Sequence, residues 1–261
     1  MLRRTLFLLF VLGLGVGNGP GHADPVDGPD CDILSGVENC KILASFESEE
    51  PGTPPDGWRT NRDRDLVPLT KDGVMTARHN VYVRGDSANQ FVRLHTEDYG
   101  FRVIRSHKNQ LEWNLDKRPY LRWRWRAKAL PNGGNEKYDR SNDTGGALYV
   151  TFDTDWLGRP KSIKYTYSST LPVGTTVDYG PLKVLVVASK PEQGTDKWIS
   201  HERNVVQDYK RLFDEEPDKT TLAFVLWSDS DTLDETGTID FDDLVMLAKP
   251  PRSDSATASS R

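Results

Sequence analysis

Acidic side chains gather in one short segment near the carboxyl end of the chain, residues 228–235, which reads SDSDTLDE. Carboxylate oxygens are the ligands that calcium prefers, so this segment is a candidate cation site. It departs from the helical calcium loop, because Leu233 stands where an oxygen ligand is needed and Asp234 where glycine is needed. A solvated turn between two strands is the alternative interpretation of Asp229 and Asp231.

Tryptophan and arginine alternate in another segment, where Trp123 and Trp125 lie between Arg122, Arg124 and Arg126. A period of two places the two residue types on opposite faces of a strand. We expect the tryptophans to pack in a core, and the alternative is a platform for sugar rings. The three arginines are suited to bidentate binding of an anionic sugar or a lipid head group, or to pairing with acids of a neighbouring strand.

A long polar stretch, residues 131–146, leads into a predicted strand, and Asp143 stands just before that strand. Loops of this length in compact domains are typically functional or mobile. Binding residues of β-proteins gather on loops and at strand ends. On this ground we select Arg124, Asp143, Asp229 and Asp231 as the ligand-binding residues of one shared site.

Signatures of catalysis are missing from the sequence that follows the first 23 residues. It has no Gly-x-Ser-x-Gly elbow and no glycine-rich phosphate loop. Its histidines are far apart and show no zinc-site spacing; they are His79, His95, His107 and His201. A carboxylate pair that cleaves a glycosidic bond needs only proximity in space, and 39 acidic residues give no choice of pair. The sequence favours a protein without catalysis.

The overall charge excludes further classes. The 261 residues include 34 Lys and Arg against 39 Asp and Glu, a formal net charge of −5. This balance argues against a protein built to bind nucleic acid. With 36% hydrophobic and 28% charged residues, the chain is neither a polytopic membrane protein nor wholly disordered.

The elements that must position these residues are mostly strands. Apolar residues alternate with polar ones or form short continuous runs, separated by clusters of Gly, Pro, Asn and Asp; the runs are 121–128, 147–152, 163–167, 182–188, 222–227 and 239–247. Many short strands punctuated by turns predict an all-β sandwich. The runs that are apolar on both faces are typical of strands between two packed sheets.

One segment has helical spacing instead. Apolar residues recur at intervals of three and four within 205–213, Asn204 is a suitable N-cap, and Pro217 ends the pattern. We predict one short helix near residues 204–214, packed across one end of the sandwich.

The first 23 residues predict export. Arg3 and Arg4 precede an apolar run over 6–14, and a small-x-small motif ends at Ala23. This order is typical of a signal peptide cut after Ala23, and the run is shorter than the ~20 residues of a membrane-spanning helix. We therefore expect a periplasmic or secreted protein without a transmembrane segment in its mature chain.

The remaining boundaries follow from composition. Residues 24–40 form an N-terminal arm rich in Pro, Gly and Asp, residues 41–249 form the sandwich domain, and residues 250–261 form a disordered tail. Cys31 and Cys40 are the two cysteines. Since close pairs in exported chains are typically oxidised, we predict a disulfide between them.

The two ends of the predicted domain resemble galactose-binding-like jelly rolls, which include many carbohydrate-binding modules. The first strand of that family often runs apolar-Phe-Glu before a Gly-Trp, as here in residues 42–47 and 57–58. Its last strand often carries an Asp-Asp pair, as here in residues 239–245. The resemblance implies that the two strands are neighbours and that a structural calcium binds there, with Glu47 and Asp242 as its carboxylate ligands.

The rest of the domain resembles a bacterial family of exported proteins known as domain of unknown function 3047. The motifs that carry this resemblance occur in order between residues 42 and 247; they are LRWRWR at 121–126, ND at 142–143, KYTY at 164–167, Trp198, RNVVQDY at 203–209, Phe213 and SDSD at 228–231. The resemblance implies export and supplies no activity.

Taken together, these features favour an exported, non-catalytic binding module for a carbohydrate or another polar ligand. Two alternatives stay open. One is a glycan-active enzyme that uses an Asp/Glu pair. The other is a cell-envelope assembly or interaction protein, for which an exposed apolar patch would speak.

Overall fold

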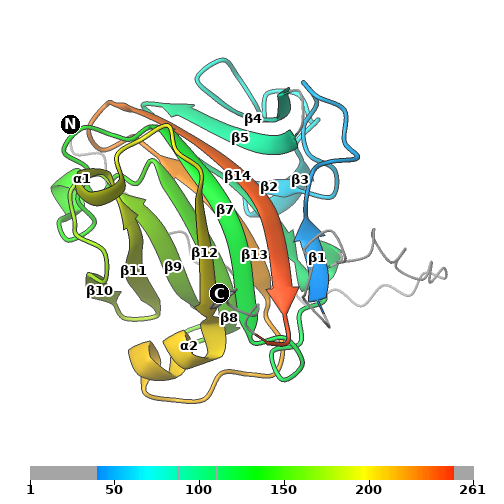
Figure 1. Cartoon of the computed structure of the whole chain (residues 1–261), viewed down its shortest axis with the longest axis vertical. Coiled ribbons are helices and arrows are strands. Elements are labelled where there is room, and N and C mark those ends of the chain that lie inside the picture. Colours follow the sequence, from blue (N-terminus) through cyan, green and yellow to red (C-terminus); the bar gives the residue numbers. More distant parts are fainter. Residues whose placement is uncertain (1–39, 87–88, 110, 250–261) are drawn as a thin grey trace, which may run out of the picture.

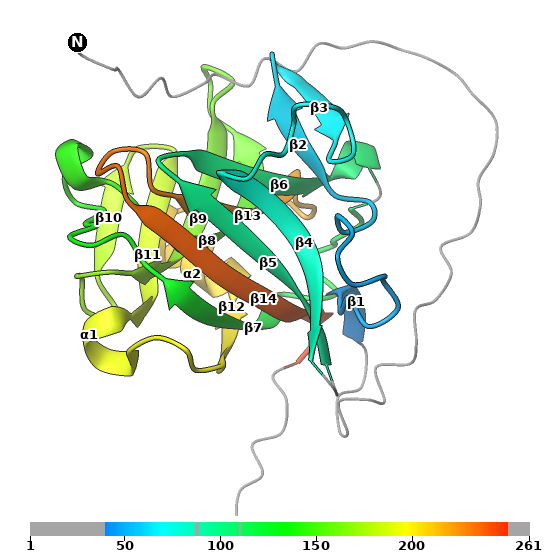
Figure 2. The ribbon, with the colours of Figure 1, turned by 90° about the horizontal axis from the view of Figure 1, so that it is seen from above.

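Two β-sheets packed face to face form the body of the protein, as the computed structural model of the chain shows (Figures 1 and 2). The structure describes residues 40–86, 89–109 and 111–249. This arrangement confirms the predicted all-β sandwich. No helix within these described ranges has the length and apolar character that crossing a membrane requires.

The first sheet has six strands. Its order is β12-β7-β14-β5-β4, and β1 also pairs with β14. The bounds are β1 Cys40–Ala44, β4 His79–Asp86, β5 Asn89–Glu97, β7 Tyr120–Ala129, β12 Ile199–Asn204 and β14 Thr236–Leu247.

The second sheet has eight strands in the order β10-β11-β9-β8-β13-β6-β2-β3. The bounds are β2 Arg59–Arg62, β3 Asp65–Pro68, β6 Gly100–Ser106, β8 Gly146–Thr154, β9 Pro160–Ser168, β10 Thr176–Tyr179, β11 Leu182–Ser189 and β13 Ala223–Asp229. Its strands are antiparallel except for β9 and β11, which run parallel.

The first and last strands of the described body are neighbours. β1 pairs antiparallel with β14, so that Ile42 lies opposite Val245. The ladder between β14 and β7 shifts register between Asp242 and Val245, where Asp243 adopts a φ of 49°. This pairing is the one that the resemblance to jelly rolls implies.

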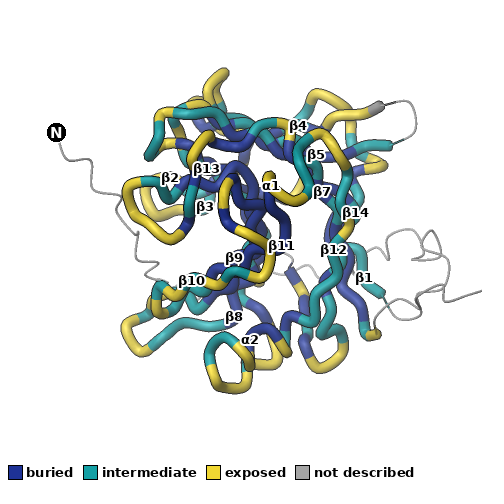
Figure 3. Tube along the Cα trace, turned by 60° about the vertical axis from the view of Figure 1, so that its left-hand side comes forward, coloured by how far each residue is buried: buried dark blue, intermediate teal, exposed yellow. Residues whose placement is uncertain are grey.

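Aromatic side chains join the two sheets. Trp123 and Trp125 of β7 are fully buried, which confirms the core interpretation of this pair. The Trp123 ring lies 5.6 Å from that of Tyr165 and the Trp125 ring 5.7 Å from that of Tyr167, both on β9 of the opposite sheet. Figure 3 shows that buried residues, in dark blue, lie mostly in the strands and that exposed residues, in yellow, lie mostly in the loops. Large buried rings contribute most of the packing in such a core.

The arginines of β7 lie on the outer face of the first sheet. Arg124 Nη2 lies 2.6 Å from Asp242 Oδ2, and Arg126 Nη2 lies 2.8 Å from Asp240 Oδ2. Both acids belong to the neighbouring strand β14 and are fully buried. Of the two interpretations of this arginine row, the structure shows pairing with acids of a neighbouring strand.

Helices are few. α2, Val205–Phe213, confirms the predicted helix, and Asn204 caps it by accepting a hydrogen bond from the Gln207 backbone N–H at 3.0 Å. The structure also has a short helix α1, Lys190–Gln193, and two 3-10 turns, η2 His107–Asn109 and η3 Asp139–Ser141.

Several predictions concern residues outside the described part of the chain. These are the signal peptide over 1–23, nearly all of the arm over 24–40, and the tail over 250–261. Cys40 begins β1, but Cys31 is not among the described residues. The leader, the domain boundaries and the Cys31–Cys40 disulfide therefore stay predictions.

Candidate functional site

Three carboxylates meet at one end of the second sheet. Asp229 ends β13, Asp231 follows it, and Asp143 precedes β8. Because β8 and β13 are antiparallel neighbours, the beginning of one lies beside the end of the other. One oxygen of each side chain lies within 4.8 Å of the other two. We call these three residues the acidic triad.

Backbone hydrogen bonds hold the acidic triad in place. Asp143 is fully buried, and its two oxygens accept from the backbone N–H groups of Thr232 at 3.0 Å and Leu233 at 2.9 Å. The Asp229 N–H donates to the Thr144 carbonyl at 2.8 Å. The loop before β8 and the turn after β13 are thereby tied together, which fixes the spacing of the carboxylates.

The electrostatics of the acidic triad centre on Asp229. Burial raises the pKa of the Asp229 carboxyl to about 7, against the opposing attraction of Lys164 and with a further rise from Asp231 and Asp143. Burial and Asp143 also raise the pKa of Asp231. Close carboxylates in a desolvated site cannot all ionise without a compensating charge. Lys164 and Arg102 offset part of this negative charge, and the all-oxygen donor set of the triad suits a hard divalent ion.

The strand next to β13 leaves room for the Asp229 side chain. Gly100 of β6 lies opposite Asp229 in the ladder. A Cβ atom on Gly100 would stand 2.8 Å from Asp229 Oδ1. A larger residue at this position would displace the carboxylate, so glycine is required by close approach.

Beside the acidic triad, four side chains form a row across the outer face of the second sheet, and we call this row the aromatic strip. It consists of Arg102 on β6, Trp227 on β13, Tyr149 on β8 and Lys164 on β9. Trp227 lies directly opposite Arg102, and Tyr149 directly opposite Lys164. Both rings are half-buried.

The two rings of the aromatic strip stack, and cations bracket them. The ring centroids are 5.4 Å apart with an angle of 30° between the planes. The Arg102 guanidinium carbon lies 4.5 Å from the centre of the Trp227 ring, and Lys164 Nζ lies 5.8 Å from that of Tyr149. Cations over aromatic faces are attracted by the ring quadrupole. These contacts hold the strip in place.

The polar loop before β8 borders the aromatic strip. Its Glu136 is fully buried and accepts hydrogen bonds from the hydroxyls of Thr144 at 3.1 Å, Thr166 at 3.0 Å and Ser168 at 2.6 Å. Lys164 Nζ donates to Thr144 Oγ1 at 2.7 Å. These bonds pin the loop to β9.

The structure brings together three of the four residues selected as a shared site. Arg124 is the exception, because it lies on β7 of the first sheet and pairs with Asp242 and Asp243. A period of two assigns a residue to one face of its strand. Neither this period nor a position near a long loop shows which sheet a strand belongs to. Selection from the sequence therefore groups Arg124 with the acidic triad, although it lies on the other sheet.

The calcium ligands implied by the jelly-roll resemblance lie away from the acidic triad. Glu47 accepts a hydrogen bond from the Gln90 backbone N–H at 3.1 Å. Asp242 accepts one from Asn89 Nδ2 at 2.8 Å and is paired with Arg124. Within the described residues, the acidic triad is the only group of three ligand side chains close enough to hold an ion. A calcium on Glu47 and Asp242 stays a prediction.

The aromatic strip is missing from the sequence-based selection. Tyr149 and Trp227 lie in runs that are apolar on both faces, which is typical of core strands. The feature that could have revealed the strip is the pairing of each ring with a cation, Trp227 with Arg102 and Tyr149 with Lys164. The two members of each pair lie on different strands, and the partner of a strand cannot be deduced from one strand at a time.

Comparison with known families gives one match. The model of a family described as "Protein of unknown function (DUF3047)" matches residues 73–245, which include the acidic triad and the aromatic strip. Among curated proteins, none matches the sequence.

Solved structures with a similar arrangement of strands include carbohydrate-binding modules. The family 11 module of a cellulosomal cellulase of Clostridium thermocellum has a TM-score of 0.40 at 10% identity, over 82% of this chain and 97% of that chain. The family 28 module, specific for non-crystalline cellulose, has 0.39 at 14%, over 79% and 93%. A xylan-binding CBM22-1 domain of Paenibacillus barcinonensis has 0.36 at 12%, over 82% and 99%. At these values the likeness identifies no ligand.

Proposed function

We propose that this chain, which belongs to the DUF3047 family, is an exported, non-catalytic module that binds a carbohydrate. The proposed binding surface is the aromatic strip. The family description names no activity, so the proposal rests on the geometry of the side chains.

The observation that carries the proposal is the stacked, half-buried pair Tyr149 and Trp227, with centroids 5.4 Å apart. The outward edges of the two stacked rings would meet the C–H groups of a sugar, while charged side chains beside them bond its hydroxyl groups. Arg102 supplies such donors at one end of the strip. Lys164 is buried and donates to Thr144 Oγ1, so it positions the other end of the strip. The strip therefore combines the two kinds of contact that a sugar offers.

A calcium ion held by the acidic triad is part of this proposal. Asp143, Asp229 and Asp231 offer three carboxylates within 4.8 Å of one another. Six to eight oxygen ligands complete a calcium site, so backbone carbonyls and water would supply the rest. The ion would neutralise the triad and lock the loop before β8 against the end of β13, beside the strip.

Export is proposed from the first 23 residues alone, which have the order of a signal peptide. Expression with the complete leader in a bacterial host, followed by N-terminal sequencing of the periplasmic fraction, tests this. Recovery of a chain that begins at Asp24 is expected, and recovery of uncut chain in the cytoplasm would contradict it.

Affinity electrophoresis and isothermal titration calorimetry with mixed-linked β-glucan, xylan and alginate test the binding. We expect at least one polysaccharide to bind, and Trp227→Ala to weaken that binding about fivefold or more, since ring stacking on tryptophan contributes about 1–3 kcal/mol. The matched control is Trp156→Ala, which removes an 88% exposed tryptophan from the β8–β9 turn. Failure of every polysaccharide to bind, or equal binding by Trp227→Ala, would refute the proposal.

A second candidate function is glycan hydrolysis by an acid pair. The observation in its favour is the pKa of Asp229, about 7, because a general acid works best near the ambient pH. The neighbouring Asp231 or Asp143 would be the second carboxylate. Release of reducing ends from the bound polysaccharide, lost in Asp229→Asn, would favour hydrolysis, and binding without release favours the module.

A further inference from the structure

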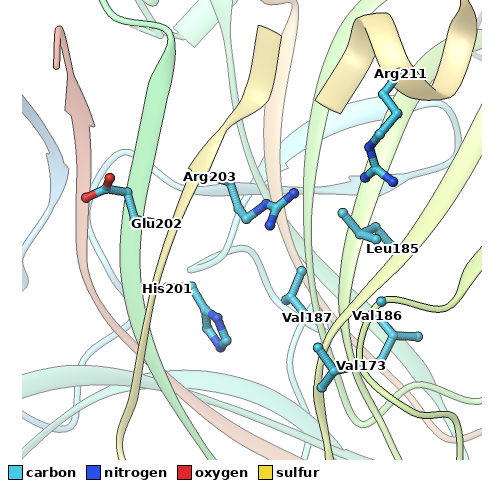
Figure 4. A pocket seen from close by; sticks show the side chains of 9 residues that line it. Val173, Leu185, Val186, Val187, His201, Glu202, Arg203 and Arg211 are labelled. Atoms are coloured by element: carbon cyan, nitrogen blue, oxygen red, sulfur yellow. The ribbon is translucent and has the colours of Figure 1, made fainter. Parts of the chain in front are cut away.

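A cleft of about 290 Å³ opens between the two sheets on the side where β12 ends one sheet and β11 runs near the edge of the other. It shares no residue with the aromatic strip or the acidic triad. Its lining includes apolar Val173, Leu185 and Val187 and polar His201, Arg203 and Arg211 (Figure 4). Volumes near 300 Å³ are at the lower end for ligand pockets, so the cleft suits a small molecule.

Alternation along β12 places its charged residues on different sides. His201 and Arg203 lie opposite Trp123 and Leu121 of β7, whose side chains point into the core. Figure 4 shows the Arg203 and Arg211 side chains reaching into the space between β12 and α2, while Glu202 points to the other side of β12. Glu202 is among the lining residues, but its side chain points away from those of Arg203 and Arg211.

On one side of the cleft, the two guanidinium groups of Arg203 and Arg211 share the single carboxylate of Asp208. Asp208 Oδ2 accepts hydrogen bonds from Arg203 Nε at 2.8 Å and from the Tyr165 hydroxyl at 3.0 Å. Asp208 Oδ1 accepts from Arg203 Nη2 and from Arg211 Nη2, the latter at 3.3 Å. One carboxylate thus serves two guanidinium groups. Their other N–H groups make no hydrogen bond to a described residue, so they are available to an anionic ligand.

His201 adds an unsatisfied polar atom to the lining. Its Nε2 is buried and has no hydrogen-bond partner among the described residues. The ring packs against Trp123 and Trp125 at 5.1 and 5.2 Å. A buried polar atom without a partner costs free energy, which a bound ligand or a water molecule would recover.

The wall of the cleft is fixed before binding. The Gly174 N–H donates to the Val186 carbonyl at 2.9 Å, and the Val173 N–H donates to Glu192 Oε1 at 2.7 Å. The first bond holds the loop that carries Val173 against β11, and the second holds it against α1. A preformed pocket avoids the free-energy cost of ordering a loop on binding.

We propose that this cleft binds a small monocarboxylate with a compact apolar body, such as an aromatic or branched-chain acid. The carboxylate lies on the free N–H groups of Arg203 and Arg211, where bidentate geometry favours a planar anion. The apolar body lies against Val173, Leu185 and Val187. Two guanidinium groups that share the one carboxylate of Asp208 favour an anion, and the apolar wall disfavours inorganic phosphate.

Calorimetry and thermal shift with phenylacetate and isovalerate test this assignment. The neutral isostere phenylacetamide and inorganic phosphate are the comparison probes. We expect a carboxylate to bind, and Arg211→Met and Val173→Phe to weaken it tenfold or more. Both side chains are more than a third exposed, so both variants should fold. The matched control Lys210→Met removes a cation from the same helix that pairs outside the cleft with Glu216.

A result that differs from these expectations overturns a specific part of the proposal. Equal binding of phenylacetamide overturns the role of the guanidinium pair, and stronger binding of phosphate overturns the apolar body. Absence of binding by both carboxylates overturns the site. At a temperature where Trp227→Ala is still folded, this variant should bind phenylacetate like the unmodified protein, and a loss of binding by the folded variant would overturn the assignment to this cleft. Failure of carbohydrate binding leaves this result unchanged.

Discussion

Tyr149 and Trp227 stack across a diagonal of the β8–β13 ladder, with ring centroids 5.4 Å apart. Tyr149 lies opposite Val225, and Trp227 lies opposite Ala147. Diagonal neighbours on one face of an antiparallel pair are within reach for aromatic side chains. The small Ala147 beside Trp227 leaves space for this contact. The stacked pair therefore depends on the register of β8 and β13, and a shift of that register by one residue would separate the two rings.

The stacking predicts a measurable coupling between the two rings. Tyr149→Ala and Trp227→Ala should each destabilise the fold, and the double variant should lose less than the sum, with a coupling of about 0.5–1.5 kcal/mol. Urea denaturation of the three variants measures this. Trp156→Ala should change the free energy of unfolding by less than about 0.5 kcal/mol, because its side chain is 88% exposed. Strict additivity would show that the rings do not form one unit.

The raised pKa of Asp229 predicts that its contribution to the free energy of unfolding falls as the pH rises in calcium-free buffer. Its carboxyl has a pKa of about 7 in the fold, against an ordinary value of 3.8. Between these values the folded state holds a proton that the unfolded state has released. The contribution of Asp229 to the free energy of unfolding is therefore full below pH 4 and is lost as the pH rises to 7. Asp229→Asn removes this dependence. Melting temperatures across this range, with a chelator present, measure the effect.

Calcium should reverse that loss. At pH 8 the ion neutralises the acidic triad and raises the melting temperature, whereas at pH 5 it must displace the proton and raises it less. Asp229→Asn should abolish the calcium effect. The matched control Asp218→Asn removes an exposed acid from the segment after α2 and should keep both dependences. A calcium effect of the same size at both pH values would contradict the account.

Arg124 and Asp242 illustrate both what alternation reveals and where it ends. The period of two in 121–128 predicts that tryptophans and arginines lie on opposite faces, and it predicts acid partners for the arginines as one outcome. It does not reveal that these acids lie on β14. Strand order depends on contacts between residues far apart in the chain, and local patterning does not encode them.

Asp143 shows how much of the site the sequence reveals. Its position before one apolar run, and that of Asp229 at the end of another, predict strand-end residues, and the structure makes β8 and β13 neighbours. The same patterning places Tyr149 and Trp227 in a core. Their exposure depends on the loop over 131–145 covering only part of the outer face, which follows from tertiary bonds such as those of Glu136.

The Arg124–Asp242 pair predicts a large cost for removing one partner. Asp242 is fully buried and Arg124 is 27% exposed, so Arg124→Met leaves a carboxylate without its cation. We expect a loss of about 3 kcal/mol in urea denaturation. Adding Asp242→Asn should restore part of it, since both charges are then gone. Arg122→Met, on the same face of the same strand, is the control and should cost about 1 kcal/mol or less. A double variant less stable than Arg124→Met would contradict this.

His201 predicts a separate loss of stability in acid. Burial, with the charge of Arg203, lowers the pKa of its imidazole to about 4 from an ordinary 6.5. The unfolded state therefore binds a proton between pH 6.5 and 4 that the folded state does not. This contribution is full above pH 6.5 and is lost as the pH falls to 4. His201→Gln should flatten that slope in urea denaturation, whereas His107→Gln, an exposed histidine, should leave it unchanged.

Gly146 lies where the two sheets approach each other closely, next to the acidic triad. A Cβ atom on this residue would stand 2.0 Å from Ile239 Cδ1 and 3.0 Å from its Cγ1, and Ile239 is fully buried. Gly146→Ala must therefore displace a packed side chain, at a cost of about 1–3 kcal/mol. Ile239→Val removes the clashing methyl group, so Gly146→Ala with Ile239→Val should be more stable than Gly146→Ala alone.

The control for this substitution is Gly85→Ala on β4, where an added Cβ would meet its nearest atom, Pro51 Cγ, at an ordinary 3.6 Å. Urea denaturation of the four variants compares them. Because Gly146 begins β8 directly after the loop that carries Asp143, the shift in Gly146→Ala should also weaken the calcium effect on the melting temperature. Gly85→Ala should leave that effect intact. A Gly146→Ala variant as stable as the unmodified protein would show that the sheets can separate here without cost, and the spacing of the acidic triad would then need another origin.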